Sequence, residues 1–306
     1  MPKVRNWKPD QLPDLTGKTY LITGGNSGIG LEAAKILGAS GGKVIIACRN
    51  PDKAKTAAAE INTVSSVKTG IVQLDLANLS SVRKAATSVK RKYKKIDALI
   101  NNAGIMQTPK LETADGFEMQ LGTNHLGHFL WTGLLFDRVE RAQGRVVTLS
   151  SIAHKYGKIH FNNLMLDRGY MPMKAYTQSK HANMLFGLEL ARRLDAAGSA
   201  VKSIICHPGY ANTNLQSSGP KGIWNTLYKP MNSLIAQSAY RGAIPTVLAA
   251  AGLEAEHGQY YGPTGMGDTR GPVGTARIIP HAKREKPAKK LWEISEDLTG
   301  FKWSFG

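Results

Sequence analysis

Tyr176 and Lys180 are the two side chains in this sequence whose types and spacing most clearly suggest acid–base chemistry. They stand four residues apart at the start of an apolar run that predicts a helix, so both should project from one helical face. A phenol has a pKa of about 10 in water and exchanges protons poorly at neutral pH unless a positive charge stabilises the phenolate. Lys180 would provide that charge. Taken alone, the pair is more simply explained as a contact on a helix surface, because this spacing often arises by chance.

A glycine-rich stretch near the N-terminus could bind a phosphate group. It reads Gly-Gly-Asn-Ser-Gly-Ile-Gly over residues 24–30, between a predicted strand at 18–23 and a predicted helix that ends near Gly41. The turn would expose backbone N–H groups, and a helix N-terminus favours an anion. The spacing G-x-x-x-G-x-G differs from the general dinucleotide pattern G-x-G-x-x-G, and a turn without a ligand is the alternative. The candidate contacts are Gly24, Asn26, Ser27, Gly28, Ile29 and Gly30.

Arg49 ends the second predicted strand, residues 43–48. Dinucleotide-binding folds usually place an acidic residue here to hold the ribose 2′-hydroxyl, whereas an arginine accommodates a 2′-phosphate. Arg49 therefore favours NADP(H) over NAD(H), with a plain surface arginine as the alternative. Asn50 and Pro51 are suited to cap and begin the next helix. Asp52, just inside that helix, is expected to favour the helix dipole instead of a ribose.

Two further strand ends carry candidate cofactor contacts. Asp75 and Leu76 follow the third predicted strand, residues 67–74, and Asp75 could reach an adenine amino group from there. The competing role for this neighbourhood is to cap the helix predicted from Ser80 onward. The fourth predicted strand, residues 96–100, ends in small residues that would let a flat cofactor lie close to the backbone, although a simple turn would look similar. The candidates at this second end are Asn102, Ala103 and Gly104.

One long helix is predicted from about residue 115 to residue 142. Asn124 is a polar residue among its apolar neighbours, so it is either a structural hydrogen-bonding group or a site residue. His125 and His128 have no further metal ligands at useful spacing and are interpreted as packing or surface histidines, and no metal site is predicted. A fifth strand is predicted at 145–149, and a pair of serines ends it.

These motifs occur in one order along the chain, each at a predicted strand end or on a predicted helix. Together they make the sequence similar to the short-chain dehydrogenase/reductase family over nearly its whole length. The His-Leu-Gly-His-Phe, Ser-Ser-Ile-Ala-His and C-terminal Leu-Trp stretches resemble the retinol dehydrogenase-like branch. The family motifs are Thr23-Gly24-x-x-x-Gly28-x-Gly30, Asn101-Asn102-Ala103-Gly104, Asn124, Ser151, Tyr176-x-x-x-Lys180 and Pro208-Gly209.

The resemblance implies a role for each matched polar residue. Tyr176 would be the general acid or base at the substrate oxygen, and Lys180 would hold the nicotinamide ribose and lower the pKa of Tyr176. Ser151 would hydrogen-bond the substrate oxygen, with Ser150 as its competitor, and Asn124 would hold a water that links Lys180 to solvent. Positioned proton transfer contributes roughly 10²–10⁴-fold to a rate, and donors aimed at a developing oxyanion contribute more.

The C-terminal third supplies the remaining strands and cofactor contacts. Pro208 and Gly209 follow the sixth predicted strand, residues 201–206. In the family this turn passes the nicotinamide, and a threonine at the position of Thr213 reaches the carboxamide or a phosphate. A turn without a ligand is again the alternative. Tyr260-Tyr261, between glycines, resembles the short last strand.

The fold that the resemblance implies is α/β: a single-domain Rossmann-type doubly wound parallel sheet flanked by helices, over residues 1–306. A glycine-bounded segment at about 213–236 is expected to be a lid over the nicotinamide. Ordinary helix packing of its aromatic residues, Trp224 and Tyr228, is the alternative. The tail at about 283–306 carries apolar residues at helical spacing and should pack on the domain.

The segment between Ser151 and Tyr176 is longer than usual in the family and is rich in methionine and tyrosine. The retinol dehydrogenase-like members share such an insertion. With the lid it would form an apolar pocket that suits a lipophilic aldehyde, ketone or alcohol. The membrane anchor of many of those relatives is not found here, so retinoid metabolism is not implied. Homodimers and homotetramers are common in the family.

The composition is that of an ordinary globular protein, with 306 residues, 42% hydrophobic and 20% charged. The net charge of +18 is spread along the chain without a nucleic-acid-binding motif, so nucleic acid is not an expected partner. Cys48 and Cys206 end strand-like runs and should be buried reduced thiols, which favours a cytoplasmic location. No apolar run is long enough to cross a bilayer.

The leading hypothesis is an NADP(H)-dependent carbonyl reductase or alcohol dehydrogenase. A non-catalytic regulator that senses the dinucleotide is a rival, and the intact Ser151, Tyr176 and Lys180 argue against it. A light-dependent tetrapyrrole reductase would keep the fold and the Tyr–Lys pair, and photoactivity would distinguish it. A basic nucleic-acid or membrane binder would be recognised by salt-sensitive binding.

Overall fold

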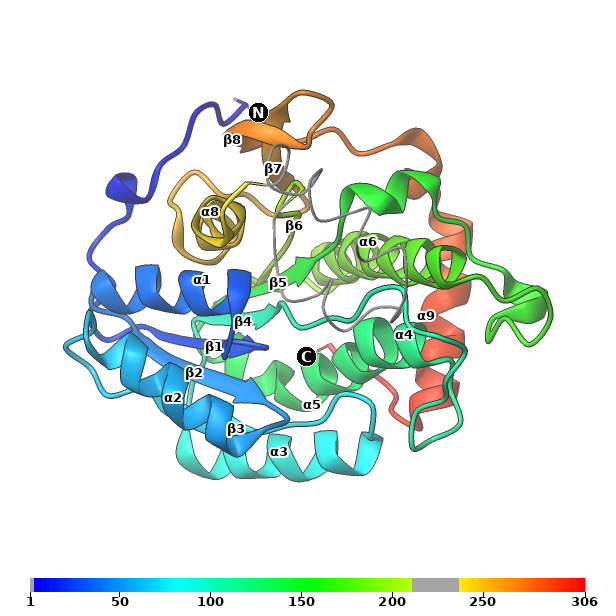
Figure 1. Ribbon diagram of the computed structural model, residues 1–306, viewed down its shortest axis with the longest axis horizontal. Coiled ribbons are helices and arrows are strands. Elements are labelled where there is room, and N and C mark those ends of the chain that lie inside the picture. The colour runs from blue at the N-terminus through cyan, green and yellow to red at the C-terminus, as the bar shows by residue number, and fades with distance from the viewer. Residues whose placement is uncertain (1–2, 211–236, 306) are drawn as a thin grey trace, which may run out of the picture.

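A computed structural model describes residues 3–210 and 237–305. Its strands form one eight-stranded sheet in the order β3-β2-β1-β4-β5-β6-β7-β8 (Figure 1). Every pair from β3 to β7 is parallel, and β8 alone runs antiparallel, beside β7. The predicted doubly wound parallel sheet is therefore confirmed. The strands are β1 Thr19–Thr23, β2 Lys43–Cys48, β3 Gly70–Gln73, β4 Ala98–Asn101, β5 Arg145–Leu149, β6 Lys202–Cys206, β7 Tyr260–Gly265 and β8 Arg270–Thr275.

Helices cover both faces of the sheet. Apolar side chains of α1, α2 and α8 pack on one face, and those of α3, α5 and α6 pack on the other (Figure 1). Burial on both faces explains why the inner strands are nearly continuous apolar runs. The helices described are α1 Gly28–Ala39, α2 Pro51–Asn62, α3 Leu79–Lys92, α4 Met119–Leu121, α5 Gly127–Glu140, α6 Pro172–Ala196, α8 Ala239–Ala251 and α9 Glu285–Thr299.

The prediction of one long, continuous helix from about residue 115 was wrong: the helix begins later, and a π-helical turn interrupts it. The backbone of Glu118 is not helical (φ −51°, ψ 130°), and its carboxylate accepts hydrogen bonds from the N–H groups of Gln120 and Leu121, which begins the helix at α4. A π-helical turn at Gly122–Leu126 then separates α4 from α5. This wider turn carries Asn124, so the irregularity lies at a predicted site residue.

The sheet also extends one strand further than predicted. Tyr260 and Tyr261 do lie in a strand, β7, but β8 follows it and pairs with it in antiparallel register. Three of the six residues of β8 are glycine or proline, so its sequence shows no alternation that would indicate a strand. The N-terminal segment extends this edge, since the N–H of Trp7 donates to the carbonyl of Val273.

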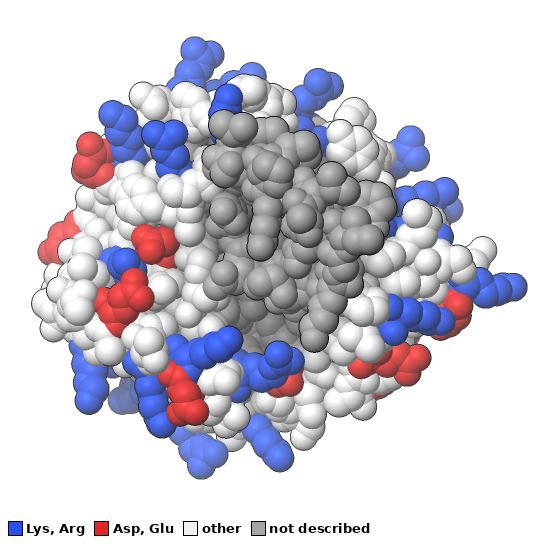
Figure 2. Space-filling model, viewed as in Figure 1, with Lys and Arg blue, Asp and Glu red and all other residues white. Residues whose placement is uncertain are grey.

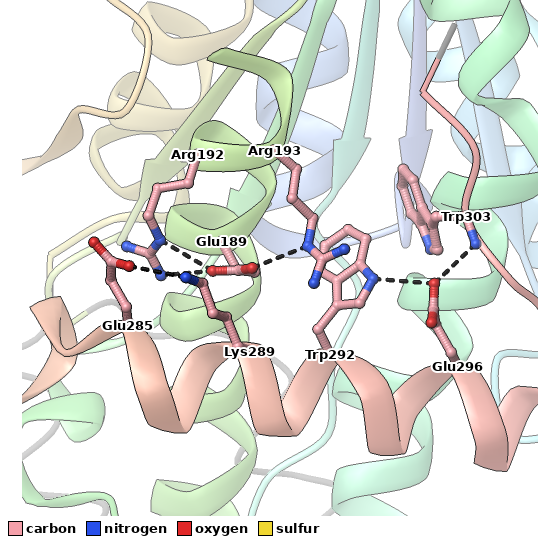
Figure 3. Close-up of polar contacts among 8 residues, drawn as sticks. All are labelled: Glu189, Arg192, Arg193, Glu285, Lys289, Trp292, Glu296 and Trp303. Carbon is pink, nitrogen blue, oxygen red and sulfur yellow. Dashed lines mark hydrogen bonds and ion pairs between the residues drawn. The ribbon is translucent and has the colours of Figure 1, made fainter. Parts of the chain in front are cut away.

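The C-terminal tail packs on α6 through α9, as its apolar stripe predicted (Figure 3). Glu189 of α6 is 2% exposed and accepts a 2.9 Å hydrogen bond from Nε of Arg193, whose guanidinium lies 4.5 Å from the ring centre of Trp292. Oε1 of Glu296 then accepts from Nε1 of Trp292 at 3.2 Å and from the N–H of Trp303 at 2.9 Å. An aromatic layer and its polar partners thus fix the tail against the outside of α6.

Basic side chains do not form one continuous patch on the face drawn in Figure 2. Lysine and arginine lie around its periphery, with acidic side chains between them. Within residues 3–210 and 237–305, no helix is both long enough and apolar enough to span a bilayer. Cys48 and Cys206 are both buried free thiols.

Candidate active site

The predicted site residues gather where the parallel strands end. In the sheet register, Ile22 of β1 lies beside Ile100 of β4, and Leu149 of β5 lies beside Cys206 of β6. The residues that follow these positions therefore meet at one edge of the sheet. In open α/β sheets this carboxyl edge is where ligands bind.

The glycine turn, residues 24–30, leads from β1 into the N-terminus of α1. Gly24 and Gly28 have φ values of +67° and +54°, which side-chain-bearing residues rarely adopt. A Cβ placed on Gly30 would lie 2.4 Å from the Gly24 carbonyl oxygen and 2.5 Å from Nδ2 of Asn102. Ser27 is the N-cap of α1, and its side chain makes no capping hydrogen bond. The first N–H groups of α1 therefore have no helical partner and can bind an anion.

The turn after β4 lacks a side chain at Gly104, so a flat cofactor could lie close to its backbone. A Cβ placed on Gly104 would lie 3.2 Å from Oδ1 of Asn124 and 3.3 Å from Nζ of Lys180. Asn102 donates to the Thr23 carbonyl at 2.8 Å, while its own Oδ1 is buried without a hydrogen-bond partner among the described residues. The close backbone, the unpaired acceptor and the free helix N-terminus fit a nicotinamide dinucleotide.

Thr23 and His128 connect the two turns, and the sequence analysis gave neither a site role. The Thr23 hydroxyl oxygen lies 3.0 Å from the N–H groups of both Asn102 and Ala103 and 2.8 Å from Nε2 of His128. Nδ1 of His128 lies 3.0 Å from the Asn124 carbonyl. Because a carbonyl only accepts, Nδ1 of His128 donates and its Nε2 accepts from Thr23. Burial lowers the pKa of His128 to about 4, which keeps it neutral in this role.

His125, the neighbouring histidine, was interpreted as a packing or surface residue. The structure shows it buried, with Nε2 2.8 Å from the Ser295 hydroxyl of α9. Both histidines are therefore interior packing residues. The signal that could have identified Thr23 is its position as the polar last residue of an apolar strand.

Arg49 and Asp75 lie at the ends of β2 and β3, as predicted. Arg49 is exposed immediately after β2. Asn50 caps α2 by accepting from the N–H groups of Asp52 and Lys53, both at 3.0 Å, and Asp52 lies in the first turn of α2. Helix capping was the competing role for this neighbourhood, and Asn78 is the residue that caps α3.

Asp75 instead folds back on its own backbone. Its Oδ1 accepts from the Ala77 N–H at 3.0 Å. Leu76 beside it is buried, and a Cβ placed on Gly127 would lie 2.4 Å from the Leu76 carbonyl oxygen. The start of α5 therefore packs closely against this strand end.

Asn124 is buried in the π-helical turn and uses its whole side-chain amide. Oδ1 accepts from the Ile105 N–H at 2.8 Å, and Nδ2 lies 3.0 Å from the Ile105 carbonyl and 2.9 Å from the Ser179 hydroxyl. It therefore ties the loop after β4 to α6. The predicted water between Asn124 and Lys180 stays a prediction.

Ser151 faces the phenol of Tyr176 and lowers its pKa, against the rise that burial causes. Tyr176 is 7% exposed on α6, and the Ser151 hydroxyl that faces it comes from the end of β5. Ser151 also accepts from the Ala153 N–H at 3.2 Å. Ser150 is fully buried and donates to the Lys180 carbonyl at 2.9 Å, so its hydroxyl is already committed. The geometry places Ser151, and not Ser150, beside the phenol.

Lys180 lies on the same side of α6 as Tyr176, with Nζ 6.0 Å from the centre of the tyrosine ring. Nζ donates to the Leu149 carbonyl at 3.3 Å. Burial lowers the pKa of Lys180 to about 8. Burial also raises the pKa of Tyr176, and the Ser151 hydrogen bond opposes that rise. Desolvation of the phenolate is the larger of these two effects, and the role of Lys180 in lowering the pKa of Tyr176 stays a prediction.

The turn after β6 closes the site on the far side. Gly209 has a φ of +69°, and a Cβ there would lie 2.3 Å from the Thr269 carbonyl oxygen. Gln237 donates through Nε2 to the Pro208 carbonyl, which holds this turn. Thr213, and the expected lid at 213–236 with Trp224 and Tyr228, lie outside the described residues.

The insertion between Ser151 and Tyr176 divides into buried and exposed parts. Ile159 and the partly buried Met165 pack in a cluster with residues of α6 and α9. Tyr156, Met171 and Met173 are 81%, 61% and 46% exposed. Only part of the predicted apolar wall is therefore free to face a ligand.

Comparison with known proteins agrees with this site. The short chain dehydrogenase family profile matches residues 18–223. The chain is 39% identical to mouse retinol dehydrogenase 11 over 292 residues, covering 94% of this chain and 87% of that protein. It is 38% identical to human retinol dehydrogenase 14 over 321 residues, covering 98% and 91%.

Solved structures show the same arrangement. A crystal structure of an uncharacterised protein from Mycobacterium paratuberculosis aligns with a TM-score of 0.82 at 39% identity, over 98% of this chain and 99% of that one. A Burkholderia cenocepacia short chain dehydrogenase in complex with NADP aligns at 0.63 and 25% identity, over 81% and 96%. The motifs at the strand ends, the sheet they terminate and these matches together establish that the chain belongs to the short-chain dehydrogenase family, in its retinol dehydrogenase-like branch, and is an oxidoreductase acting on CH–OH or C=O groups.

Proposed function

We propose that the protein interconverts a lipophilic aldehyde or ketone and the corresponding alcohol with NADP(H). The observation that supports this most is the tyrosine site, which we define as Ser151, Tyr176 and Lys180. Its serine hydroxyl faces its phenol, and its buried ammonium lies beside the backbone of Gly104. A protein that only sensed the dinucleotide would have no need of this proton donor.

Each residue of the tyrosine site has a chemical part in the proposal. NADPH, when bound, would supply the hydride. Ser151 would donate its hydroxyl hydrogen to the substrate oxygen, because its own oxygen already accepts from the Ala153 N–H. Tyr176 would then transfer its proton to that oxygen. Burial raises the pKa of Tyr176 and so keeps it protonated at neutral pH, which favours the direction of carbonyl reduction.

Lys180 and Asn124 would organise the site around that transfer. The lowered pKa of Lys180, about 8, leaves it mostly charged at neutral pH, so it can bind ribose hydroxyl groups. Asn124 holds the loop of Gly104 against α6 through Ile105 and Ser179. Cofactor contacts from the glycine turn, Leu76, Asn102, Ala103, Pro208, Gly209 and Thr213 remain part of the proposal.

The preference for NADP(H) rests on Arg49. It is exposed at the end of β2, where a 2′-phosphate would lie in this fold, while Asp52 belongs to the first turn of α2. The Burkholderia relative was solved with NADP, which supports this cofactor class. Asp75, whose Oδ1 already accepts a hydrogen bond from the Ala77 N–H, would contact the adenine.

The lipophilic substrate class rests on the exposed apolar side chains between Ser151 and Tyr176 and on the relatives named retinol dehydrogenases. A cytoplasmic location is proposed from the buried free thiols.

The test is oxidation of NADPH and NADH by the purified protein with a panel of aldehydes, ketones and quinones. We expect turnover of long-chain or aromatic carbonyls with NADPH. Turnover confined to charged sugars or acyl-carrier thioesters would overturn the substrate class, and no turnover of any carbonyl would overturn the reaction.

A further inference from the structure

His154 is a buried histidine that the proposed reaction does not yet use. It follows Ser151 in a short 3-10 helix, Ile152–Tyr156, for which Ser151 is the N-cap. Its side chain is 0% exposed. A fully buried imidazole three residues from a proposed substrate-binding serine requires a physical explanation, because burying a polar ring without partners is costly.

The imidazole of His154 is directed at Ser151 itself. Nδ1 lies 2.6 Å from the Ser151 carbonyl oxygen, and the backbone N–H of His154 donates to the same oxygen at 3.0 Å. Since a carbonyl cannot donate, Nδ1 must carry the hydrogen. Nε2 is then an unprotonated nitrogen, and it is buried without a partner among the described residues. The ring therefore makes its strong hydrogen bond to Ser151.

Two neighbours hold the imidazole in this orientation. The ring of Tyr260 meets it edge-on, with ring centres 5.4 Å apart, and the Tyr260 hydroxyl lies 3.4 Å from Nδ1. On the other side, Nδ1 of His181 lies 3.2 Å from the His154 carbonyl. His181 follows Lys180 on α6. The segment after β5 is thus attached to α6 through His181, and Ser151 at its start faces Tyr176 of the same helix.

We propose that His154 is a positioning residue, whose Nδ1–H fixes the Ser151 backbone and so directs the Ser151 hydroxyl at Tyr176 and the substrate oxygen. This inference rests on the proposed function. With both carbonyl lone pairs occupied by His154, the peptide after Ser151 cannot rotate freely. A hydroxyl that must meet a developing oxyanion loses much of its effect when it is displaced by about 1 Å.

The test compares two substitutions whose side chains share the same number and branching of heavy atoms, His154→Asn and His154→Leu. The asparagine amide can place its N–H near the position of Nδ1, whereas leucine cannot donate. We expect His154→Leu to lower kcat by about 100-fold with little change in the affinity for NADPH measured by fluorescence. His154→Asn should recover most of the lost kcat, and His154→Gln, whose amide reaches the position of Nε2, should behave like leucine.

Equal kcat values in the asparagine and leucine variants would overturn the positioning role, because a purely packing role does not distinguish them. If wild-type protein turned over no carbonyl, the proposed function would fail first, and the positioning role with it. A wild type that is active and matched by His154→Leu would remove the positioning role alone.

A measurement on unmodified protein covers the case in which the variants do not fold. Nitrogen-15 NMR of histidine-labelled wild type reports which ring nitrogen is protonated. We expect His154 as the Nδ1–H tautomer, assigned by loss of its signals in any soluble His154 variant or from its contact with Tyr260. An Nε2–H tautomer would contradict the bond to Ser151 and overturn the inference.

Discussion

The glycine turn and the tyrosine site lie at the same edge of one sheet but work by different physics. The glycine turn presents backbone N–H groups to a ligand. Gly30 must lack a side chain, because a Cβ there would clash with the Gly24 carbonyl oxygen. The tyrosine site depends on burial, which moves the pKa of both Tyr176 and Lys180 away from their values in water. The glycine turn depends on the absence of side chains, and the tyrosine site depends on the exclusion of water.

This difference decides what each region should lose on mutation. Damage to the glycine turn should weaken cofactor binding and leave the chemistry of bound complexes largely intact. Loss of the Tyr176 hydroxyl should remove turnover and leave cofactor binding largely intact, whereas Lys180 would serve both functions. The predictions below separate the two regions on that basis.

Tyr176→Phe should have the largest effect. It removes the proton donor while keeping the ring, so kcat should fall by roughly 10³-fold, within the usual range for a positioned acid. Affinity for NADPH should change little, because the variant keeps Lys180, which would bind the ribose. Stopped-flow or steady-state kinetics beside a fluorescence titration measure both quantities. Unchanged kcat in this variant would place the proton donor elsewhere.

Gly30→Ala should act on the other region. The new Cβ would lie 2.4 Å from the Gly24 carbonyl oxygen, a backbone atom, so the turn must shift. We expect the Kd for NADPH to rise by about 100-fold, the loss typical of a 1 Å displacement at a site, with a smaller change in kcat at saturating cofactor. Gly169→Ala is the control for backbone strain without a steric clash, because Gly169 has a φ of +66° and its Cβ would meet nothing within 4 Å. Equal effects of the two substitutions on the Kd would contradict the account.

Acid should destabilise the fold through its buried histidines. Burial lowers the pKa of His125 and His207 to about 3 and of His128, His154 and His181 to about 4. Their pKa values in the folded protein lie below that of an unfolded histidine, about 6.5. The stability they contribute is therefore complete above that pH and is lost as the pH falls toward 4. Each should contribute a slope of up to about 1.4 kcal/mol per pH unit.

Urea unfolding between neutral pH and about pH 5 measures this slope. His181→Gln should reduce the slope of unfolding free energy against pH by the contribution of one histidine. A free energy of unfolding that stays constant over this range would show that these imidazoles are not buried neutral in solution.

Arg49→Ala should have the smallest effect. Loss of one exposed cation facing a 2′-phosphate should lower the preference for NADPH over NADH by about tenfold, as expected for a charge-assisted hydrogen bond. The NADH reaction of the same variant is the internal control, since it lacks that phosphate. Equal use of both cofactors by the wild type would remove the argument from Arg49.

The sequence predicted the glycine turn and the strand ends well, because their signals are local. The bounds of β2 and β5 agree with the predicted strands, and Asn50 and Pro51 begin α2 as expected. Tyr176 and Lys180 share one side of α6 because helical spacing alone determines that. These features depend on residues adjacent in the chain.

What the sequence did not predict depends on tertiary contacts. The π-helical turn at Asn124 follows from contacts with Ile105 and Ser179, which are distant in the chain. The burial that raises the pKa of Tyr176 is set by the surrounding fold, so it could not be predicted from the Tyr–Lys spacing. The unpaired Nε2 of His154 can be recognised only when its surroundings are known.

The most direct test of the central claim is a crystal structure of the protein with NADP(H) bound. We predict that the Tyr176 hydroxyl and the Ser151 hydroxyl face the nicotinamide ring across the space for a carbonyl, with Lys180 bonded to the adjoining ribose. A dinucleotide bound elsewhere, or a nicotinamide ring out of reach of Tyr176, would contradict the account.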